Sequence, residues 1–288
     1  MKIPILPVMA TMAAVTNAYL KGFNIAAEKP DGSCRTQADW ELAFRNIQKL
    51  PGGPFDQARL FATSDCNTLA RAVPAALAAN TRILVGVWTE DEAHFGREKA
   101  ALLDAIQKYG GGWITAISVG SETLYRKEAD PNRLAQQIYD VRGMVRSVGV
   151  GQAVGHVDTW TAWVDPANRP VVVACDFVGT DAYPYWQGTT IPASTDTFWK
   201  AIADTRAAVT AVKKGLEVWV TETGWPATGK NFGASTASVQ NAKAYWKGVA
   251  CSSLKQMNTF WYSYQDYTSE PSFGVYGKNG QPLFDMTC

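Results

Sequence analysis

Two glutamates stand where a pair of carboxyl groups could act on one bond. Glu122 directly follows the tight run SVGS, and Glu222 directly follows VWVT, so each comes at the exit of a strand-like segment. Hydrolysis of a glycosidic bond uses such a pair, because one carboxyl group protonates the leaving oxygen while the other attacks the sugar or activates water. The two glutamates therefore predict this chemistry if the fold brings both strand exits together.

Metal-dependent chemistry is the competing use of paired acids. The chain has two histidines, His94 and His156, and no spacing that gathers three metal ligands. The remaining acidic residues at strand exits are Glu28, Glu90, Asp158, Asp181 and Asp266. We therefore expect no metal and no cofactor, with the chemistry carried by side chains alone.

Strand-like runs alternate with helical patterns along most of the chain. The eight runs are 19–27, 55–63, 82–90, 113–122, 152–160, 176–185, 216–224 and 258–266. Eight strands separated by helices over about 250 residues predict a single-domain (β/α)8 TIM barrel of the α/β class, with its chemistry at the carboxy-terminal strand ends. The fourth and seventh strands lie across such a barrel, so Glu122 and Glu222 would share its mouth. A doubly wound open sheet is the alternative, but no strand is followed by a glycine-rich phosphate loop.

Signals for helix starts support this alternation. Thr36 with Asp39 has the form of a capping box and precedes apolar residues at helical spacing, and Ser235 opens a similar pattern. Further helices are predicted over 91–109, 132–148 and, in a shorter form, 161–168.

Charge and composition bound the possible partners. The 288 residues include 27 Lys plus Arg and 26 Asp plus Glu, without any basic run. A net charge of +1 gives no electrostatic attraction for nucleic acid or an anionic membrane, so we expect neither as a partner. The 11 Trp and 11 Tyr suit a neutral sugar, because flat aromatic rings pack against the C–H faces of sugar rings.

The amino terminus has the form of a secretory signal. Lys2 precedes an apolar stretch over 3–15, and small residues end at Ala18. We therefore predict a signal peptide over 1–18, a catalytic barrel over 19–288 and a secreted protein. Beyond this segment no apolar run reaches the length of a membrane span, and the carboxy terminus carries no hydrophobic anchor tail.

The cysteines suit an oxidising compartment. There are 5, an odd number, and they lack the spacing of a zinc site. In a secreted chain we expect two disulfides and one buried thiol. The expected pairs are Cys34 with Cys66 and Cys251 with Cys288, and Cys175 within VVVACDFVG is the expected buried thiol.

Five stretches together resemble a known family. They are ISVGSETLYR (117–126), VGHVDTWTAWV (154–164), DAYPYWQ (181–187), VWVTETGWP (218–226) and PSFGVYG (271–277). In this order they resemble fungal glycoside hydrolase family 17, the β-1,3-glucanases and β-1,3-glucanosyltransferases, and the resemblance runs from about Lys21 to Gly277.

The resemblance implies a mechanism with retention of anomeric configuration. It makes Glu122 the acid/base and Glu222 the nucleophile of an enzyme that cleaves internal β-1,3-glucosidic bonds through a covalent glycosyl-enzyme. The substrates would be β-1,3-glucan or laminari-oligosaccharides, and the outcome hydrolysis, glucanosyl transfer or both. Ser121 stands where most of the clan has Asn, although Ser is similar to what fungal members have. We expect a monomer, secreted and associated with the cell wall.

Several further residues are expected to support the two glutamates. Tyr183 is the expected hydrogen-bond donor to Glu222, and Arg59 in QARLF is expected to supply a positive charge that favours the ionised nucleophile. The residues expected to line sugar subsites or the site wall are Tyr125, Asp158, Trp160 and Trp225. Retention also requires that the two carboxyl groups lie about 5 to 5.5 Å apart.

Two other functions remain open from the sequence. One is a β-glucan-binding barrel whose catalysis has lapsed, although both acids are present. The other is a relative within the same clan that acts on β-1,4-glucan. Assays on oligosaccharides of each linkage distinguish them.

Overall fold

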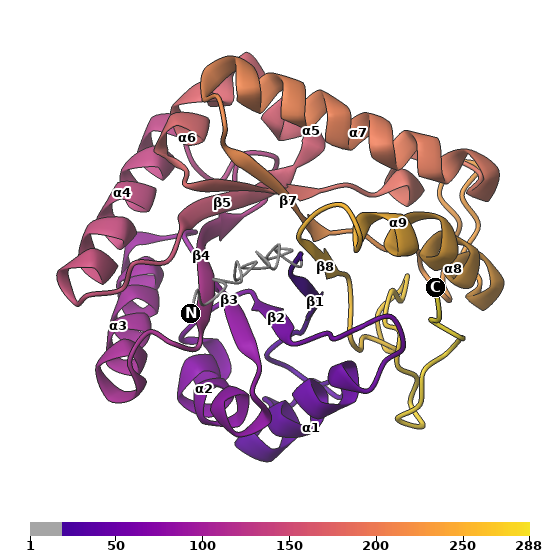
Figure 1. The fold of residues 1–288 in the computed structure, drawn as a ribbon, viewed down its shortest axis with the longest axis horizontal. Coiled ribbons are helices and arrows are strands. Elements are labelled where there is room, and N and C mark those ends of the chain that lie inside the picture. Colours follow the sequence, from indigo (N-terminus) through magenta and orange to yellow (C-terminus); the bar gives the residue numbers. More distant parts are fainter. Residues whose placement is uncertain (1–18) are drawn as a thin grey trace, which may run out of the picture.

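Eight parallel strands close on one another in the order in which they occur along the chain (Figure 1). The computed structural model describes residues 19–288, so the predicted signal peptide over 1–18 lies outside the described residues. The strands are β1 (Lys21–Asn24), β2 (Gln57–Leu60), β3 (Arg82–Val87), β4 (Ile114–Ser121), β5 (Val154–Thr159), β6 (Phe177–Asp181), β7 (Glu217–Glu222) and β8 (Thr259–Trp261). Pairing of β8 with β1 completes the barrel, which confirms the predicted (β/α)8 fold.

Helices surround the barrel and cover the outer faces of the strands (Figure 1). They are α1 (Gln37–Gln48), α2 (Thr68–Ala79), α3 (Glu92–Tyr109), α4 (Pro131–Ser147), α5 (Trp160–Trp163), α6 (Arg169–Ala174), α7 (Ile191–Val212), α8 (Val239–Tyr245) and α9 (Cys251–Ser253). Because both faces of each strand are covered, the strands have the nearly continuous apolar character of parallel sheets.

The predicted helix starts are right in one case and displaced in the other. Thr36 caps α1 through a complete capping box with Asp39, as predicted. The helix assigned to a start at Ser235 begins three residues later, because Ser238 is the residue whose hydroxyl accepts from the Asn241 amide, at 3.1 Å. The Ser235 hydroxyl is instead buried and donates to the Thr189 carbonyl at 2.7 Å, which ties two mouth loops together.

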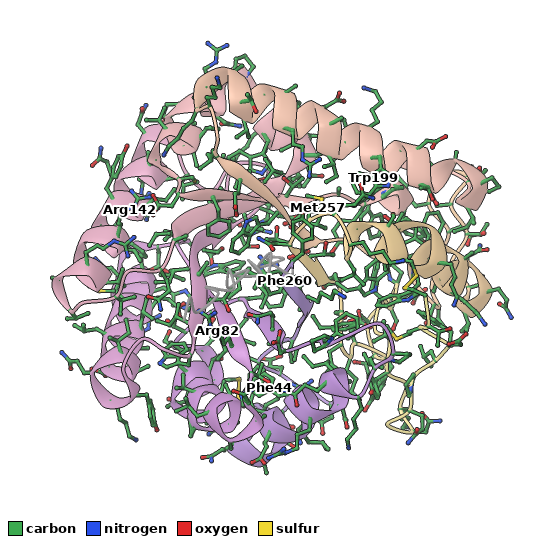
Figure 2. The ribbon with its side chains drawn as sticks, viewed as in Figure 1. Phe44, Arg82, Arg142, Trp199, Met257 and Phe260 are labelled. Atoms are coloured by element: carbon green, nitrogen blue, oxygen red, sulfur yellow. A yellow bond between two sulfur atoms is a disulfide. The ribbon has the colours of Figure 1, made fainter. Side chains whose placement is uncertain are left out.

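Apolar side chains pack both outside and inside the ring of strands. Figure 2 shows Phe44 among the helices and Phe260 near the barrel axis. The cluster inside the barrel consists of Leu84, Ala116, Phe177, Trp219 and Phe260. The rings of Phe177 and Trp219 stack with their centroids 4.4 Å apart. This plug fills the barrel interior, so the mouth above it has a rigid floor.

Both expected disulfides are formed in the structure. Cys34 bonds to Cys66 and Cys251 to Cys288, while Cys175 is a buried free thiol. Burial raises the pKa of the Cys175 thiol to about 12, so it remains protonated and unreactive at neutral pH. Within the described residues, no helix combines the length and the apolar character that crossing a membrane requires.

The contact between β5 and β6 predicts a strong effect of one methyl group. A Cβ added to Gly155 would overlap the Phe177 carbonyl oxygen and lie 2.8 Å from the Phe177 ring. Because the first obstacle is backbone, we expect Gly155→Ala to lower the free energy of unfolding by about 3 kcal/mol in urea denaturation. Gly151→Ala is the control, because no atom lies within 4 Å of its added Cβ. Equal stability of the two variants would contradict this packing.

Candidate active site

A cavity of about 530 Å³ opens at the carboxy-terminal ends of the strands. Its acidic lining residues are Glu122, Asp181, Glu222 and Asp266, and its aromatic ones are Tyr125, Trp160, Tyr183, Trp186, Tyr262 and Phe273. Acids at the floor with aromatic rings around them suit a sugar chain, which offers hydroxyl groups and apolar ring faces together.

The two predicted glutamates meet in this cavity. Glu122 follows β4, Glu222 ends β7, and a carboxylate oxygen of one lies within 4.8 Å of an oxygen of the other. Inverting glycosidases hold their carboxyl groups about 6.5 to 9.5 Å apart to admit a water, whereas retaining ones hold them about 5 to 5.5 Å apart. The observed spacing therefore matches the geometry for direct attack by one carboxylate.

Glu222 is held by two donors, one for each carboxylate oxygen. Arg59 on β2 forms an ion pair and hydrogen bond with Oε1, and the Tyr183 hydroxyl donates to Oε2 at 2.7 Å. The Glu222 residue is only 7% exposed. Because each oxygen has its own donor, the Glu222 carboxylate is fixed in position and orientation.

Arg59 is itself fixed by neighbours from other strands. Its Nη1 donates to the Asn24 side-chain oxygen at 2.7 Å, and its Nη2 donates to the Ser121 hydroxyl at 2.9 Å. The Asn24 side-chain nitrogen in turn donates to the Thr221 carbonyl at 2.9 Å. Asn24 was not among the predicted site residues, and its signal in the sequence is a polar side chain between the apolar residues Phe23 and Ile25.

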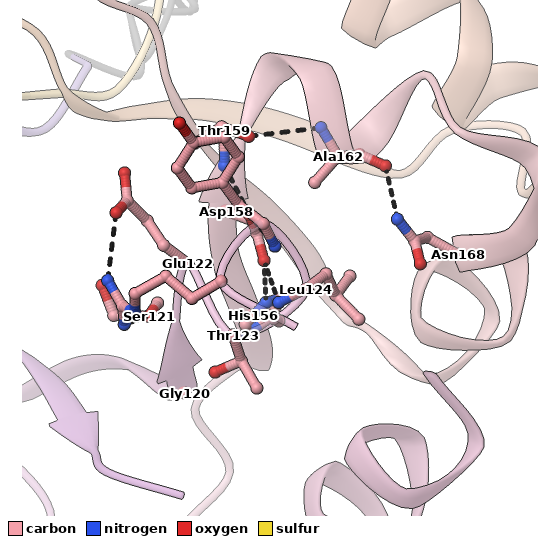
Figure 3. Close-up of polar contacts among 12 residues, drawn as sticks. Gly120, Ser121, Glu122, Thr123, Leu124, His156, Asp158, Thr159, Ala162 and Asn168 are labelled. Atoms are coloured by element: carbon pink, nitrogen blue, oxygen red, sulfur yellow. Dashed lines mark hydrogen bonds and ion pairs between the residues drawn. The ribbon is translucent and has the colours of Figure 1, made fainter. Parts of the chain in front are cut away.

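The backbone of Glu122 is held in an uncommon conformation. Its φ of 52° lies in the left-handed region, which few non-glycine residues adopt, and its amide donates to the Val157 carbonyl at 2.8 Å. The buried Asp158 carboxylate accepts from the amides of Leu124 at 2.8 Å and Tyr125 at 3.3 Å (Figure 3). Asp158 therefore holds the turn that carries Glu122 and is not exposed to the cavity, which is the supporting one of the two roles expected for it.

A second buried residue contacts the Asp158 carboxylate. His156 has one ring nitrogen 2.9 Å from the Asp158 carboxylate (Figure 3). Its other ring nitrogen lies 2.7 Å from the Val119 carbonyl. Both ring nitrogens thus face oxygen atoms in a place without solvent exposure. The pair links β5 to β4 directly beneath the turn of Glu122.

The environment of Glu122 suits an acid. Burial and the neighbouring negative charge of Glu222 raise the pKa of Glu122 to about 7, and the Arg126 guanidinium opposes this shift. Arg126 donates to the Glu122 carboxylate at 3.0 Å, and its guanidinium carbon lies 5.2 Å from the centre of the Trp88 ring. Two carboxyl groups in one cavity thus have different environments, one favouring the protonated form and one the ionised form.

Residues 22–277 match the model of the BtgE/BtgC glycoside hydrolase domain. The chain belongs to this glycoside hydrolase family. A protein of Aspergillus fumigatus named "probable glucan endo-1,3-beta-glucosidase" is 40% identical over 97% of this chain and 68% of its own length. The Aspergillus oryzae protein of the same name is also 40% identical, and the chain covers 65% of it. A glucan 1,3-beta-glucosidase of Schizosaccharomyces pombe is 34% identical over 97% of this chain and 89% of its own.

Solved structures agree with this assignment. The family 17 β-1,3-glucanosyltransferase of Rhizomucor miehei matches with a TM-score of 0.80 and 30% identity, over 93% of this chain and 97% of that one. An active-site mutant of that enzyme, solved with laminaritriose, matches with a TM-score of 0.80 and 29% identity over the same shares. These matches confirm the resemblance to fungal family 17 that the sequence motifs indicate.

The aromatic residues predicted to line this hydrolase's cavity are only partly there. Tyr125, at 59% exposure, and Trp160 line it. Trp225 does not, because it is 2% exposed and its indole nitrogen donates to the Thr236 carbonyl at 2.9 Å. The buried ring packs instead against Tyr185, with the two ring centroids 5.2 Å apart. The sequence analysis did not single out Trp186, although its motif DAYPYWQ contains it.

Two groups of side chains in the described part of the hydrolase could in principle hold a cation. They are Asp65 with His94 and Glu98, and Glu122 with Asp181 and Glu222. In the first group, Glu98 already accepts from three backbone amides, at 2.7, 2.7 and 3.0 Å. In the second, Arg59 and Tyr183 occupy both oxygens of Glu222. In both groups, therefore, one carboxylate already has both oxygens occupied.

The hydrogen bond from Tyr183 gives a test of the Glu222 environment. We expect Tyr183→Phe to lower kcat for glycosidic bond cleavage about 10- to 100-fold, because a buried carboxylate loses one of its two donors. Steady-state kinetics on an oligosaccharide substrate measure the effect. Tyr276→Phe is the control, since that buried hydroxyl donates to the Asn46 carbonyl on α1. If both variants retained wild-type kcat, Tyr183 would not serve Glu222.

The position of Arg126 predicts a shift in the pH profile. With the pKa of Glu122 at about 7, kcat/KM should decline above pH 7, since the acid must be protonated. Removing a cation disfavours the ionised carboxylate, so Arg126→Gln should move this alkaline limb to higher pH. Arg133→Gln, which removes an exposed guanidinium paired with Glu92, should leave the limb in place. If the alkaline limb of Arg126→Gln lay at the wild-type pH or at a lower pH, this electrostatic account would be refuted.

Proposed function

We propose that this glycoside hydrolase cleaves internal β-1,3-glucosidic bonds of β-1,3-glucan or laminari-oligosaccharides with retention of anomeric configuration. The observation that carries the proposal is the unequal pair of carboxyl groups, with Glu222 held by Arg59 and Tyr183 and with Glu122 within 4.8 Å of it. The linkage is supported by the relatives, which are named glucan endo-1,3-beta-glucosidase and beta-1,3-glucanosyltransferase.

In the first step, Glu222 attacks the anomeric carbon while Glu122 donates its proton to the leaving oxygen. Arg59 and Tyr183 keep the attacking carboxylate ionised and oriented before the substrate arrives. The glycosidic bond breaks, a glycosyl ester forms on Glu222, and Glu122 is left ionised. Because its pKa is raised, the Glu122 carboxyl group carries the proton that this step needs.

In the second step, Glu122 takes a proton from the incoming hydroxyl group, which attacks the ester. The ester carries no negative charge, so the repulsion that raised the pKa of Glu122 is gone and the ionised form is favoured. Water as the incoming group gives hydrolysis, and a sugar hydroxyl gives glucanosyl transfer. The aromatic rings of Tyr125, Trp160 and Trp186 line the same cavity and can bind the faces of an acceptor sugar.

Two further parts of the proposal concern the state of the protein. The two disulfides support secretion, because such bonds form and persist in oxidising compartments. We also propose a monomer, because Glu222 and both of its donors, Arg59 and Tyr183, come from the same barrel.

The deciding experiment is product analysis on laminari-oligosaccharides. We expect the β-anomer to form first in proton NMR, with shorter products from hydrolysis and longer ones from transfer, and no cleavage of cello-oligosaccharides. Glu222→Gln should abolish turnover while the variant folds and binds sugar, whereas Glu217→Gln, at the exposed start of β7, should remain active. Wild-type binding without turnover would indicate a lapsed barrel, first formation of the α-anomer would exclude retention, and faster cleavage of cello-oligosaccharides would indicate a β-1,4 enzyme.

A further inference from the structure

A third carboxyl group lies between the two glutamates. Asp181 ends β6 and is the direct neighbour of Glu222 in the sheet register. A carboxylate oxygen of Asp181 lies within 4.8 Å of an oxygen of Glu122 and of an oxygen of Glu222. The residue borders the cavity, yet it is only 1% exposed. The Asp181 side chain therefore forms part of the cavity floor next to the two glutamates.

The hydrogen bonding of Asp181 is that of an acid rather than of a carboxylate. Its Oδ1 accepts from the Thr221 hydroxyl at 2.8 Å, while its Oδ2 is buried and has no partner among the described residues. A buried carboxylate is costly unless it is paired and fully hydrogen-bonded. A protonated Oδ2 removes this cost, because the charge is then absent.

The buried Arg59 guanidinium, which pairs with Glu222, is committed to partners other than Asp181. Arg59 directs its two terminal nitrogens to Glu222, to Asn24 and to Ser121, and within the described part of the chain it forms no ion pair with Asp181. Glu222 takes the positive charge that an ionised Asp181 would need. The site thus has charge compensation for one buried carboxylate and not for two.

We propose that Asp181 is a neutral carboxylic acid whose Oδ2 hydroxyl faces the two glutamates and acts as a positioning donor for whichever of them is ionised. This inference rests on the proposed function of the glutamate pair. The charged and titratable groups that face Asp181 are Glu222 from β7, Glu122 after β4, Arg59 from β2 and Tyr183 after β6. Burial and the charge of Glu222 raise the pKa of Asp181 well above its usual range, and Arg59 opposes them less strongly.

A neutral donor at this place suits the movement of charge in the reaction. In the first step the negative charge leaves Glu222, which becomes an ester, and arises on Glu122, which has lost its proton. An Asp181 oxygen lies within 4.8 Å of an oxygen of each glutamate and bonds to neither, so a shift of the side chain must shorten the gap before its O–H donates to either. Asp181 keeps its proton throughout, and no bond to it forms or breaks.

Infrared spectroscopy tests the protonation state directly. In a Glu122→Gln background, which removes the other raised carboxyl group, the protein should keep the C=O stretching band of a protonated carboxylic acid at pH 7. The band should shift in D₂O and should be lost in Glu122→Gln/Asp181→Asn. If the first variant showed no such band, Asp181 would be ionised and the proposal overturned. This measurement needs no substrate, so it stands even if the enzyme fails to cleave laminari-oligosaccharides.

Kinetics on laminari-oligosaccharides test the donor role. Asp181→Asn retains an N–H donor without charge, so we expect kcat to fall only a few-fold and the alkaline limb of kcat/KM to stay in place. Asp181→Ala removes the donor, so we expect a further fall of about tenfold. An alkaline limb that moves to lower pH in Asp181→Asn would mean that a negative charge had been lost, and equal kcat in the two variants would mean that no donor was needed. Either result would overturn the proposal.

Discussion

The buried ion pair between Arg59 and Glu222 is the interaction on which the rest of the site depends. Both side chains are almost fully removed from water, with 1% and 9% exposure, and such a pair is stable only when its remaining hydrogen-bonding groups are satisfied. Asn24, Ser121 and Tyr183 satisfy most of them, while Arg59 Nε is buried without a hydrogen-bond partner among the described residues. Together with Arg59 and Glu222, these residues come from four strands and from the loop after a fifth, so only a closed barrel can bring them together. The closed barrel is therefore required to stabilise the buried ion pair between Arg59 and Glu222.

The two glutamates are held in different ways, and the difference suits their chemistry. Glu222 is fixed through its carboxylate, because both oxygens have donors. Glu122 is fixed through a left-handed turn that Asp158 and His156 hold from the backbone side, so its carboxyl group keeps a cavity-facing edge. A group that only attacks needs one orientation, whereas a group that gives and later takes a proton must reach two oxygen atoms in turn. Backbone anchoring leaves that freedom.

The fold and the glutamate pair could be predicted because both depend on order along the chain. Alternation of strands and helices defines the barrel, and a residue at or within two positions of a strand's carboxy-terminal end is expected at the barrel mouth, which holds for Glu122, Glu222 and Tyr183. Beyond the strand end this reasoning stops. Trp225 comes three residues after β7, where the chain turns freely, and its ring lies behind the wall. Asn24 acts through contacts with residues up to 237 positions away, which no local pattern contains.

Hydrolysis and transfer share everything that the floor of the cavity provides. In the proposed mechanism both proceed from the same ester on Glu222, and both need Glu122 to accept a proton from the incoming hydroxyl. The floor residues therefore set the rate of both outcomes together. The choice between water and sugar is made where an acceptor would lie, among the aromatic rings of the rim, because a bound sugar there raises the local concentration of its hydroxyl groups. In this barrel the residues at the strand ends thus determine whether a glycosidic bond is broken, and the residues of the loops determine whether water or a sugar is the acceptor.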